Sequence, residues 1–206
     1  MKYQTYGKRL FDLSLCLATA PLVLPAIAAV ALVSWVSRQD RVFFWHQRPG
    51  RGGQGFNFYK MATLRNAAVD AQGKLLNEGQ RQTRWGKFLR DYSLDELPQW
   101  FNILKGDMSW VGPRPLLTEY LPYYTARQNQ RHRVKPGLTG LAQINGRNQL
   151  SWQRKLAYDW LYVQHISFKL DMYILAGTLW QLGTRQKVNF GQRRLTGPPP
   201  QKVIGL

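Results

Sequence analysis

The sequence predicts an α+β, mainly helical protein with an N-terminal re-entrant membrane helix, a small β-hairpin and amphipathic interfacial helices around one site. Three observations predict this fold. An almost uncharged apolar segment runs from Leu10 to Val36, two aromatic runs flank a glycine-rich turn between residues 42 and 60, and apolar residues recur at helical spacing beyond residue 84. Since 206 residues suffice for one core, we expect a membrane element at 1–40, one globular domain at 41–184 and a mobile basic tail at 185–206.

The apolar segment carries a single charge, Asp12, which is expected to pair with Lys8 and Arg9 one turn away. As one helix it would be about 40 Å long, enough to cross a hydrocarbon core of about 30 Å. Pro21 removes a backbone hydrogen bond and should kink the helix, and neither half spans alone. Lysines and arginines flank both ends, and such flanks prefer the cytoplasmic side. We therefore predict a re-entrant hairpin broken at Pro21, with a straight transmembrane helix, a cleaved signal peptide or a buried core helix as alternatives.

The rest of the chain divides into short elements. Strands are expected at 42–45 and 56–59, a polar loop at 66–84, helices at 85–92, 94–104 and 116–127, and a basic, glycine-rich loop at 131–147. Two aromatic-rich helices are expected between 151 and 183, broken near Ile166 and Ser167. Their tryptophans and tyrosines suit either a membrane interface or an ordinary core.

The charge balance indicates an anionic partner. The formal net charge is +18, which favours nucleic acid, an acidic membrane surface or a phosphorylated substrate. Eight tryptophans and ten tyrosines suit the boundary between lipid and water. The single cysteine, Cys16, excludes an internal disulfide and is expected to be a small buried apolar residue.

The candidate catalytic residues are the adjacent carboxylates Asp95 and Glu96. The pattern Ser93-x-x-Glu96 also fits a capping box, which is the purely structural interpretation. If the helix instead begins at Asp95, Pro98 falls harmlessly in the first turn, and the helix N-terminus favours ionised carboxylates and phosphate. An ionised aspartate beside a bound diphosphate can act as a nucleophile, with Mg²⁺ held by the acid pair to offset the repulsion. Arg114, restricted by prolines on both sides, is the best candidate for binding phosphate.

Several motifs in order give this chain a resemblance to the bacterial sugar transferase family, specifically to the small monotopic polyprenol-phosphate phosphoglycosyl transferases. The resemblance covers about residues 5 to 185, and motifs in register are more specific than any one alone. The matching motifs are Lys8-Arg9-x-x-Asp12, Gln47-Arg48-Pro49-Gly50, Ser93-Leu94-Asp95-Glu96-Leu97-Pro98-Gln99, Asn102-x-Leu104-Lys105-Gly106-Asp107-Met108-Ser109, Gly112-Pro113-Arg114-Pro115, Lys135-Pro136-Gly137-Leu138-Thr139-Gly140 and Asn145-Gly146-Arg147.

The resemblance implies a reaction and a place. A UDP-sugar would give its phosphosugar to undecaprenyl phosphate and release UMP, at the cytoplasmic face of the bacterial inner membrane, with membrane lipid but no nucleic acid as a partner. By motif position Asp95 would be the covalent nucleophile, and Glu96 would hold Mg²⁺ or help to activate the acceptor. Arg114, Arg90 and Arg147 would bind substrate phosphates.

One departure from the family pattern lies after the hairpin, where this chain has Lys60-Met61-Ala62-Thr63-Leu64. The family usually has a second basic residue where Ala62 stands, so Lys60 or Arg65 would have to compensate. The departure motivates an alternative, a catalytically impaired membrane scaffold of the same fold. A basic nucleic-acid-binding protein is a further alternative, which the long uncharged run and the lack of a known binding motif disfavour.

Overall fold

The computed structural model describes residues 3–37, 41–66, 69, 72–73, 76–146 and 149–184. The expected tail at 185–206 lies outside these residues. A π-helical turn, Tyr3–Gly7, leads into the first helix. The α-helices are α1 (Lys8–Val36), α2 (Glu78–Arg81), α3 (Arg84–Asp91), α4 (Gln99–Lys105), α5 (Ala126–Asn129), α6 (Leu141–Ile144), α7 (Trp152–Gln164) and α8 (Phe168–Gly183). The strands are β1 (Phe43–Pro49), β2 (Gly55–Met61), β3 (Ser109–Val111) and β4 (Gly137–Thr139), and short 3₁₀ helices occupy Arg51–Gly53, Leu94–Glu96, Thr118–Tyr123 and Gln130–Arg133.

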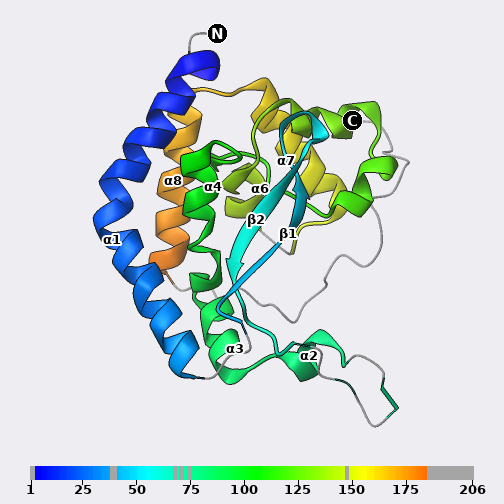
Figure 1. Cartoon of the computed structure of the whole chain (residues 1–206). Helices are drawn as coiled ribbons and strands as arrows, with labels where there is room; N and C mark the ends of the chain where they lie inside the picture. Colours follow the sequence, from blue (N-terminus) through cyan, green and yellow to red (C-terminus); the bar gives the residue numbers. More distant parts are fainter. Residues whose placement is uncertain are drawn as a thin grey trace.

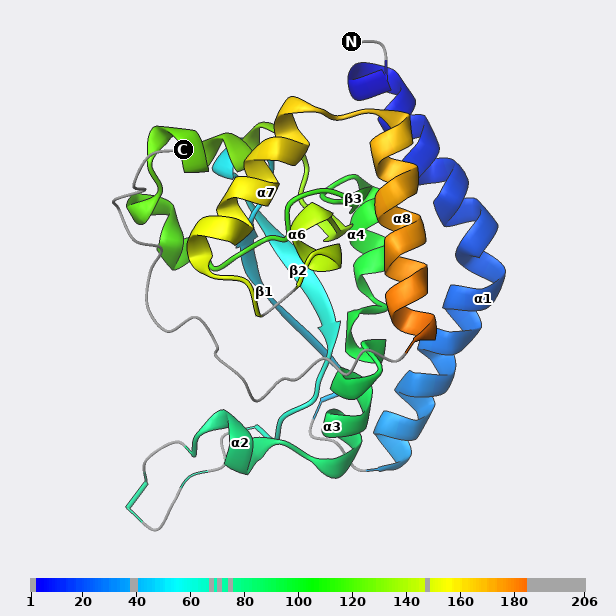
Figure 2. The same cartoon turned by 180° about the vertical axis from the view of Figure 1, so that it is seen from behind.

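Helix α1 stays continuous through Pro21 and Pro25, so it is one bent helix rather than two helices joined by a turn. Figures 1 and 2 show it bowed around the rest of the molecule, with its convex side outward. The prolines remove backbone hydrogen bonds, and the Thr19 hydroxyl donates to the carbonyl of Leu15 at 2.7 Å, a back-bond that also favours bending. The segment Tyr3–Val36 is long and apolar enough to cross a membrane, by length and composition alone.

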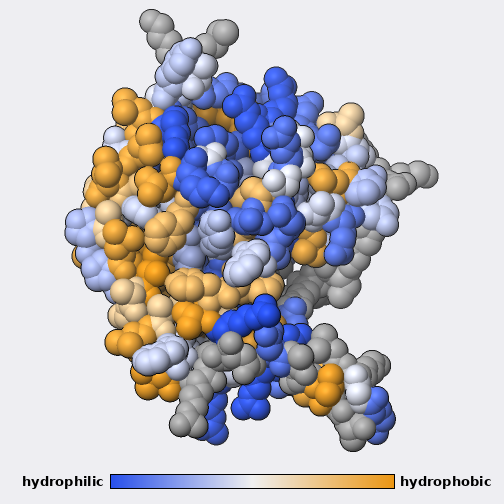
Figure 3. Space-filling model, in the orientation of Figure 1, coloured by the Kyte–Doolittle hydropathy of each residue, from blue (hydrophilic) through white to orange (hydrophobic). Residues whose placement is uncertain are grey.

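One face of α1 packs on the domain along most of its length. The Asp12 carboxylate accepts from the Ser109 hydroxyl at 2.8 Å, and near the other end Trp85 Nε1 donates to the Ser34 hydroxyl at 2.8 Å. The opposite face is exposed and apolar, including Leu10, Leu17, Leu22, Leu32, Val33, Trp35 and Val36. In Figure 3 this apolar surface covers the α1 side of the molecule, whereas hydrophilic residues gather away from it.

A buried ion pair links the start of α1 to the start of α8. Asp171 at the start of α8 is fully buried and accepts from Lys8 Nζ and from the Tyr3 hydroxyl, each at 2.6 Å. The Tyr162 hydroxyl donates to its second oxygen at 2.8 Å. The expectation that Asp12 pairs with the neighbouring cations is therefore wrong: Lys8 bonds Asp171, and Arg9 donates to the carbonyls of residues 103 and 104.

The predicted hairpin is confirmed as β1 and β2, antiparallel from Phe43 opposite Met61 to Pro49 opposite Gly55. Gly52 and Gly53 turn the chain with φ of 69° and 78°, values that favour glycine. Phe58 of β2 joins Cys16 of α1 and Trp100 of α4 in one buried cluster, which confirms the apolar role expected for the cysteine.

The structure corrects the expected loop at 131–147, which contains β4 and α6. Strand β4 pairs in parallel with β3, Ser109 opposite Gly137 and Val111 opposite Thr139. Glycine permits this contact, because a Cβ at Gly137 would lie 2.1 Å from the backbone nitrogen of Gly112. The glycines that suggested a loop are therefore points of close backbone approach.

The remaining helices are partly as expected. Helix α3 and the pair α7 and α8, broken between residues 164 and 168, are confirmed. The expected helix at 94–104 is instead a 3₁₀ turn followed by α4, and the one at 116–127 is a 3₁₀ helix followed by α5. The loop at 66–84 contains the short helix α2, which a capping box of Asn77 and Gln80 begins.

Candidate active site

The acid pair lies in the 3₁₀ turn between α3 and α4. Ser93 enters the turn in the left-handed region, with φ of 58°, and its side chain caps nothing. Its backbone carbonyl accepts instead from the Glu96 amide at 3.2 Å. The capping-box interpretation is therefore wrong, and a strained backbone at Ser93 presents Asp95 and Glu96 on one tight turn.

Lys60 connects the hairpin to both acids. Its Nζ lies 3.3 Å from Asp95 Oδ2 and 2.9 Å from Glu96 Oε1. Ala62 is buried. The backbone carbonyl of Arg65 accepts a hydrogen bond from Arg81 Nε at 3.0 Å. Lys60 is therefore the basic residue of this segment that reaches the acids.

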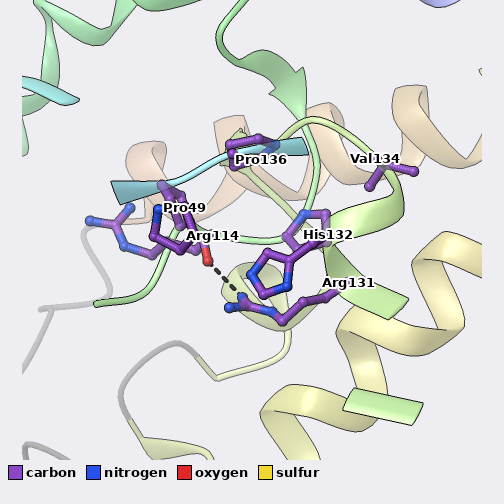
Figure 4. A pocket seen from close by; sticks show the side chains of 9 residues that line it. Pro49, Arg114, Arg131, His132, Val134 and Pro136 are labelled. Atoms are coloured by element: carbon purple, nitrogen blue, oxygen red, sulfur yellow. Dashed lines mark hydrogen bonds between the residues drawn. The ribbon is translucent and has the colours of Figure 1, made fainter. Parts of the chain in front are cut away.

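Arg114 holds Glu96 from the other side with two hydrogen bonds. Nη1 donates to Oε2 at 3.1 Å, and Nη2 donates to Oε1 in a second, short contact. The backbone of Arg114 is fixed in turn, because Arg131 Nη2 donates to its carbonyl at 2.6 Å, the dashed line in Figure 4. Arg131 is buried and forms an ion pair with Asp159 of α7 at 2.8 Å. Helix α7 thus holds the backbone of the Pro-Arg-Pro segment through Arg131.

The surroundings shift the pKa values of the two carboxyl groups in opposite directions. Burial disfavours the charged form of Glu96, but Arg114 and Lys60 outweigh it and hold the pKa of Glu96 well below its usual range. Burial raises the pKa of Asp95, and the neighbouring Glu96 adds to this effect while Lys60 opposes it. Glu96 is thus a fixed anion, whereas Asp95 is the more basic carboxylate. Within the described part of the chain Oδ1 of Asp95 accepts no hydrogen bond, so it is free to react.

The acid pair fits a magnesium ion that takes most of its ligands from phosphate and water. No group of three or more histidine, cysteine or carboxylate side chains suited to a metal occurs among the described residues. Magnesium commonly needs only one or two carboxylates beside substrate phosphates. The Lys60 ammonium already lies between the two carboxylates, where the local field favours positive charge.

The structure brings together four of the predicted site residues, Lys60, Asp95, Glu96 and Arg114, and does not bring Arg90 to them. Arg90 Nε donates to the Thr63 hydroxyl at 2.9 Å, and its Nη1 lies 3.7 Å from Glu78. The predicted phosphate ligand Arg147 lies outside the described residues.

Sequence reasoning missed the supporting residues of the site. Arg131 falls in the loop predicted at 131–147, and nothing in the sequence connects it with Asp159, which is 28 residues away. His46 carried no signal, although it lies two residues before Arg48, and that arginine belongs to a motif quoted above.

Nearly the whole chain matches a known family. The family model described as "Bacterial sugar transferase" matches residues 3–185. The uncharacterized sugar transferase EpsL of Bacillus subtilis is 46% identical over 198 residues, 92% of this chain and 96% of that protein. The exopolysaccharide production protein ExoY of Rhizobium meliloti is 35% identical and covers 84% of each chain.

The name of a longer relative states a reaction. The UDP-glucose:undecaprenyl-phosphate glucose-1-phosphate transferase of Xanthomonas campestris is 37% identical over 188 residues, 85% of this chain. This chain spans only 38% of that protein's length. The motifs identified in the sequence and the family match over nearly the whole chain lead to the same conclusion: the chain belongs to the bacterial sugar transferase family.

Proposed function

We propose that this protein transfers a sugar phosphate from a UDP-sugar to undecaprenyl phosphate through a covalent intermediate on Asp95. The observation that carries the proposal is the unequal acid pair. Glu96 is bonded by Arg114 and Lys60, whereas Oδ1 of Asp95 accepts no hydrogen bond from the residues that the structure describes. Relatives from Xanthomonas campestris and Klebsiella pneumoniae carry names that state such a transfer with glucose.

In the first step a carboxylate oxygen of Asp95 attacks the sugar-bearing phosphorus of the donor. A bond forms between that oxygen and phosphorus, the bond from phosphorus to the UMP oxygen breaks, and UMP leaves with the electron pair. The raised pKa of Asp95, caused mainly by burial, makes the carboxylate a stronger nucleophile once it is ionised.

In the second step a phosphate oxygen of undecaprenyl phosphate attacks the same phosphorus. The bond to Asp95 breaks, the carboxylate is restored, and undecaprenyl diphosphosugar is released. Arg114 and Lys60 offset the charge on the phosphoryl oxygens, and Glu96 fixes both cations at the site. A magnesium ion on the acid pair would supply further positive charge to the phosphates.

We propose that α1 re-enters the membrane from the cytoplasmic face. Its apolar outer face suits lipid, whereas its inner face contacts the domain from Asp12 to Ser34. A bilayer that enclosed the whole helix in hydrocarbon would also have to enclose polar parts of the domain, which is costly. The single variants Gln4→Cys and Ser37→Cys, each in a Cys16→Ser background, should therefore react with a membrane-impermeant reagent from the same side. Labelling of the two positions from opposite sides would contradict re-entry.

The mechanism is tested by incubating the enzyme with UDP-glucose, UDP-galactose or an N-acetylated UDP-sugar, stopping the reaction and measuring the mass of the protein. The wild type should release UMP and gain the mass of a phosphosugar, and Asp95→Asn should do neither. Asp91→Asn, the same change at an exposed aspartate four residues earlier, should behave as the wild type. Full turnover by Asp95→Asn would exclude the nucleophile.

Two further measurements separate the remaining proposals. Chelation of divalent cations should stop turnover and added Mg²⁺ should restore it, so turnover that persists in chelator would exclude magnesium. The scaffold alternative, motivated by Ala62, predicts no turnover with any donor in the presence of undecaprenyl phosphate. Because Lys60 contacts both acids without help from position 62, we favour the active enzyme.

A further inference from the structure

The inner face of the β-hairpin carries a second cation that the mechanism above does not use. His46 and Arg48 of β1 lie opposite Phe58 and Phe56 of β2, and residues that pair across the strands share a face. Lys60 lies on the same face, two residues beyond Phe58. The Arg48 guanidinium carbon lies 6.0 Å and Lys60 Nζ lies 5.6 Å from the centre of the Phe58 ring. Arg48 and Lys60, the cation that bridges the acid pair, therefore both contact the Phe58 ring.

Arg48 differs from the other arginines around the site because it has no acidic partner. Arg114 is paired with Glu96 and Arg131 with Asp159, but no ion pair in the described part of the chain includes Arg48. Its Nε donates to His46 Nε2 in a short contact, and that is the one hydrogen bond its side chain makes among these residues. Both terminal nitrogens are left free to bind an anion in a bidentate manner.

The surroundings make an empty Arg48 site electrostatically unfavourable. Burial and the nearby Arg114 lower the pKa of Arg48 to about 10, against weaker opposing effects of Tyr120, Glu119 and Tyr124. Pro49, the next residue after Arg48, lines the same small pocket as Arg114 (Figure 4). The charges of Arg48 and Arg114 repel each other, so an anion bound near both would stabilise them.

His46 is suited to hold Arg48 in this position. Burial, with help from Arg48 and Lys60, lowers the pKa of His46 to about 4, so the ring is neutral at physiological pH. A neutral ring can accept a hydrogen bond at Nε2, which a protonated one cannot. The contact leaves Arg48 one fixed direction in which to present its two free nitrogens.

We propose that Arg48 binds the phosphate that is not transferred, namely the UMP phosphate in the first step and the undecaprenyl phosphate in the second. The inference rests on the proposed function. In an in-line displacement the leaving oxygen lies opposite the attacking Asp95 oxygen. The acceptor must later attack opposite Asp95 as well, so one anion site serves both phosphates in turn. Lys60 and Arg114, which contact the acids, lie beside the transferred phosphoryl group, and Arg48 is the next cation outward.

The test compares Arg48→Gln with Arg51→Gln, the same change at an exposed arginine in the adjoining turn. Binding of UMP and of uridine is measured through their inhibition of adduct formation. The Arg48→Gln variant should bind UMP about 10- to 100-fold more weakly, because it loses a charge-assisted contact, and should bind uridine normally. In a single-turnover experiment with preformed adduct it should need about 10- to 100-fold more undecaprenyl phosphate for half-maximal transfer. Arg51→Gln should match the wild type in each measurement.

Several results would overturn the inference. Equal weakening of UMP and uridine would show that Arg48 does not contact phosphate, and loss confined to UMP or to the acceptor would exclude one shared site. Wild-type behaviour of Arg48→Gln would exclude any such role. These outcomes differ from failure of the proposed function, in which the wild type itself forms no adduct. Both variants should unfold at the same temperature as the wild type, which excludes loss of folding as the cause of weaker binding.

Discussion

The buried ion pair behind Arg114 gives a prediction with a magnitude. The side chains of Arg131 and Asp159 are each 3% exposed and lie 2.8 Å apart. Asp159→Asn leaves Arg131 charged and uncompensated, a change that typically costs about 3–5 kcal/mol. In a protein of this size about 1 kcal/mol corresponds to about 2–4 °C, so the unfolding temperature should fall by roughly 6–20 °C. Because Arg131 also holds the Arg114 carbonyl, transfer activity should fall as well.

The assay is thermal unfolding in lipid nanodiscs, followed by tryptophan fluorescence at a fixed heating rate. Asp91→Asn is the control, since its pair with Lys87 is 41% and 65% exposed and should contribute only about 0.3–0.5 kcal/mol. The double variant Arg131→Met, Asp159→Leu should recover much of the stability, because it removes both charges. It should not recover activity, because the donor to the Arg114 carbonyl is gone. A shift for Asp159→Asn no larger than that of the control would refute the reasoning.

Three further predictions concern the acids, pH and packing. Glu96→Gln removes the charge that holds Arg114 and leaves Lys60 paired with Asp95 alone, so it should lower kcat by about 100- to 1000-fold while the covalent adduct still forms. Loss of the adduct would contradict the division of roles. Burial lowers the pKa of His46 and of His132 to about 4, from about 6.5 when unfolded. The unfolded chain therefore binds more protons between these values, so stability should fall as pH drops from about 6.5 to about 4, with a shallower fall for His132→Phe in thermal unfolding. A Cβ at Gly86 would lie 2.0 Å from a backbone carbonyl, so Gly86→Ala should lower the unfolding temperature. Gly183→Ala should not, because among the described residues a Cβ there meets no atom within 4 Å apart from its chain neighbours and its own helix backbone.

The sequence predicted the elements whose signals are local. The aromatic runs around Gly52 and Gly53 gave the hairpin, and the break near Ser167 separated α7 from α8 as expected. The sheet of β3 and β4 was missed because its strands are three residues each and their glycines make contacts distant in sequence. No periodic pattern exists in so short a strand.

The site shows the same division between local and distant information. Motif position and chemistry both single out Asp95, Glu96, Arg114 and Lys60, and the structure places these four side chains together. The turn at Ser93 was misread as a capping box because a left-handed serine leaves no trace in residue type. Which cation meets which acid depends on tertiary packing, and the sequence could not give it.

The link between Lys8 and Asp171 has a consequence for biosynthesis. Helix α1 leaves the ribosome before α8, and the carboxylate that neutralises its lysine follows 163 residues later. Until then the ammonium group must remain hydrated, because burying it alone is costly. Helix α1 therefore reaches its final position only after the start of α8 has been translated, and a chain that stops before residue 171 leaves the binding surface for Lys8 incomplete and exposed to cellular quality control.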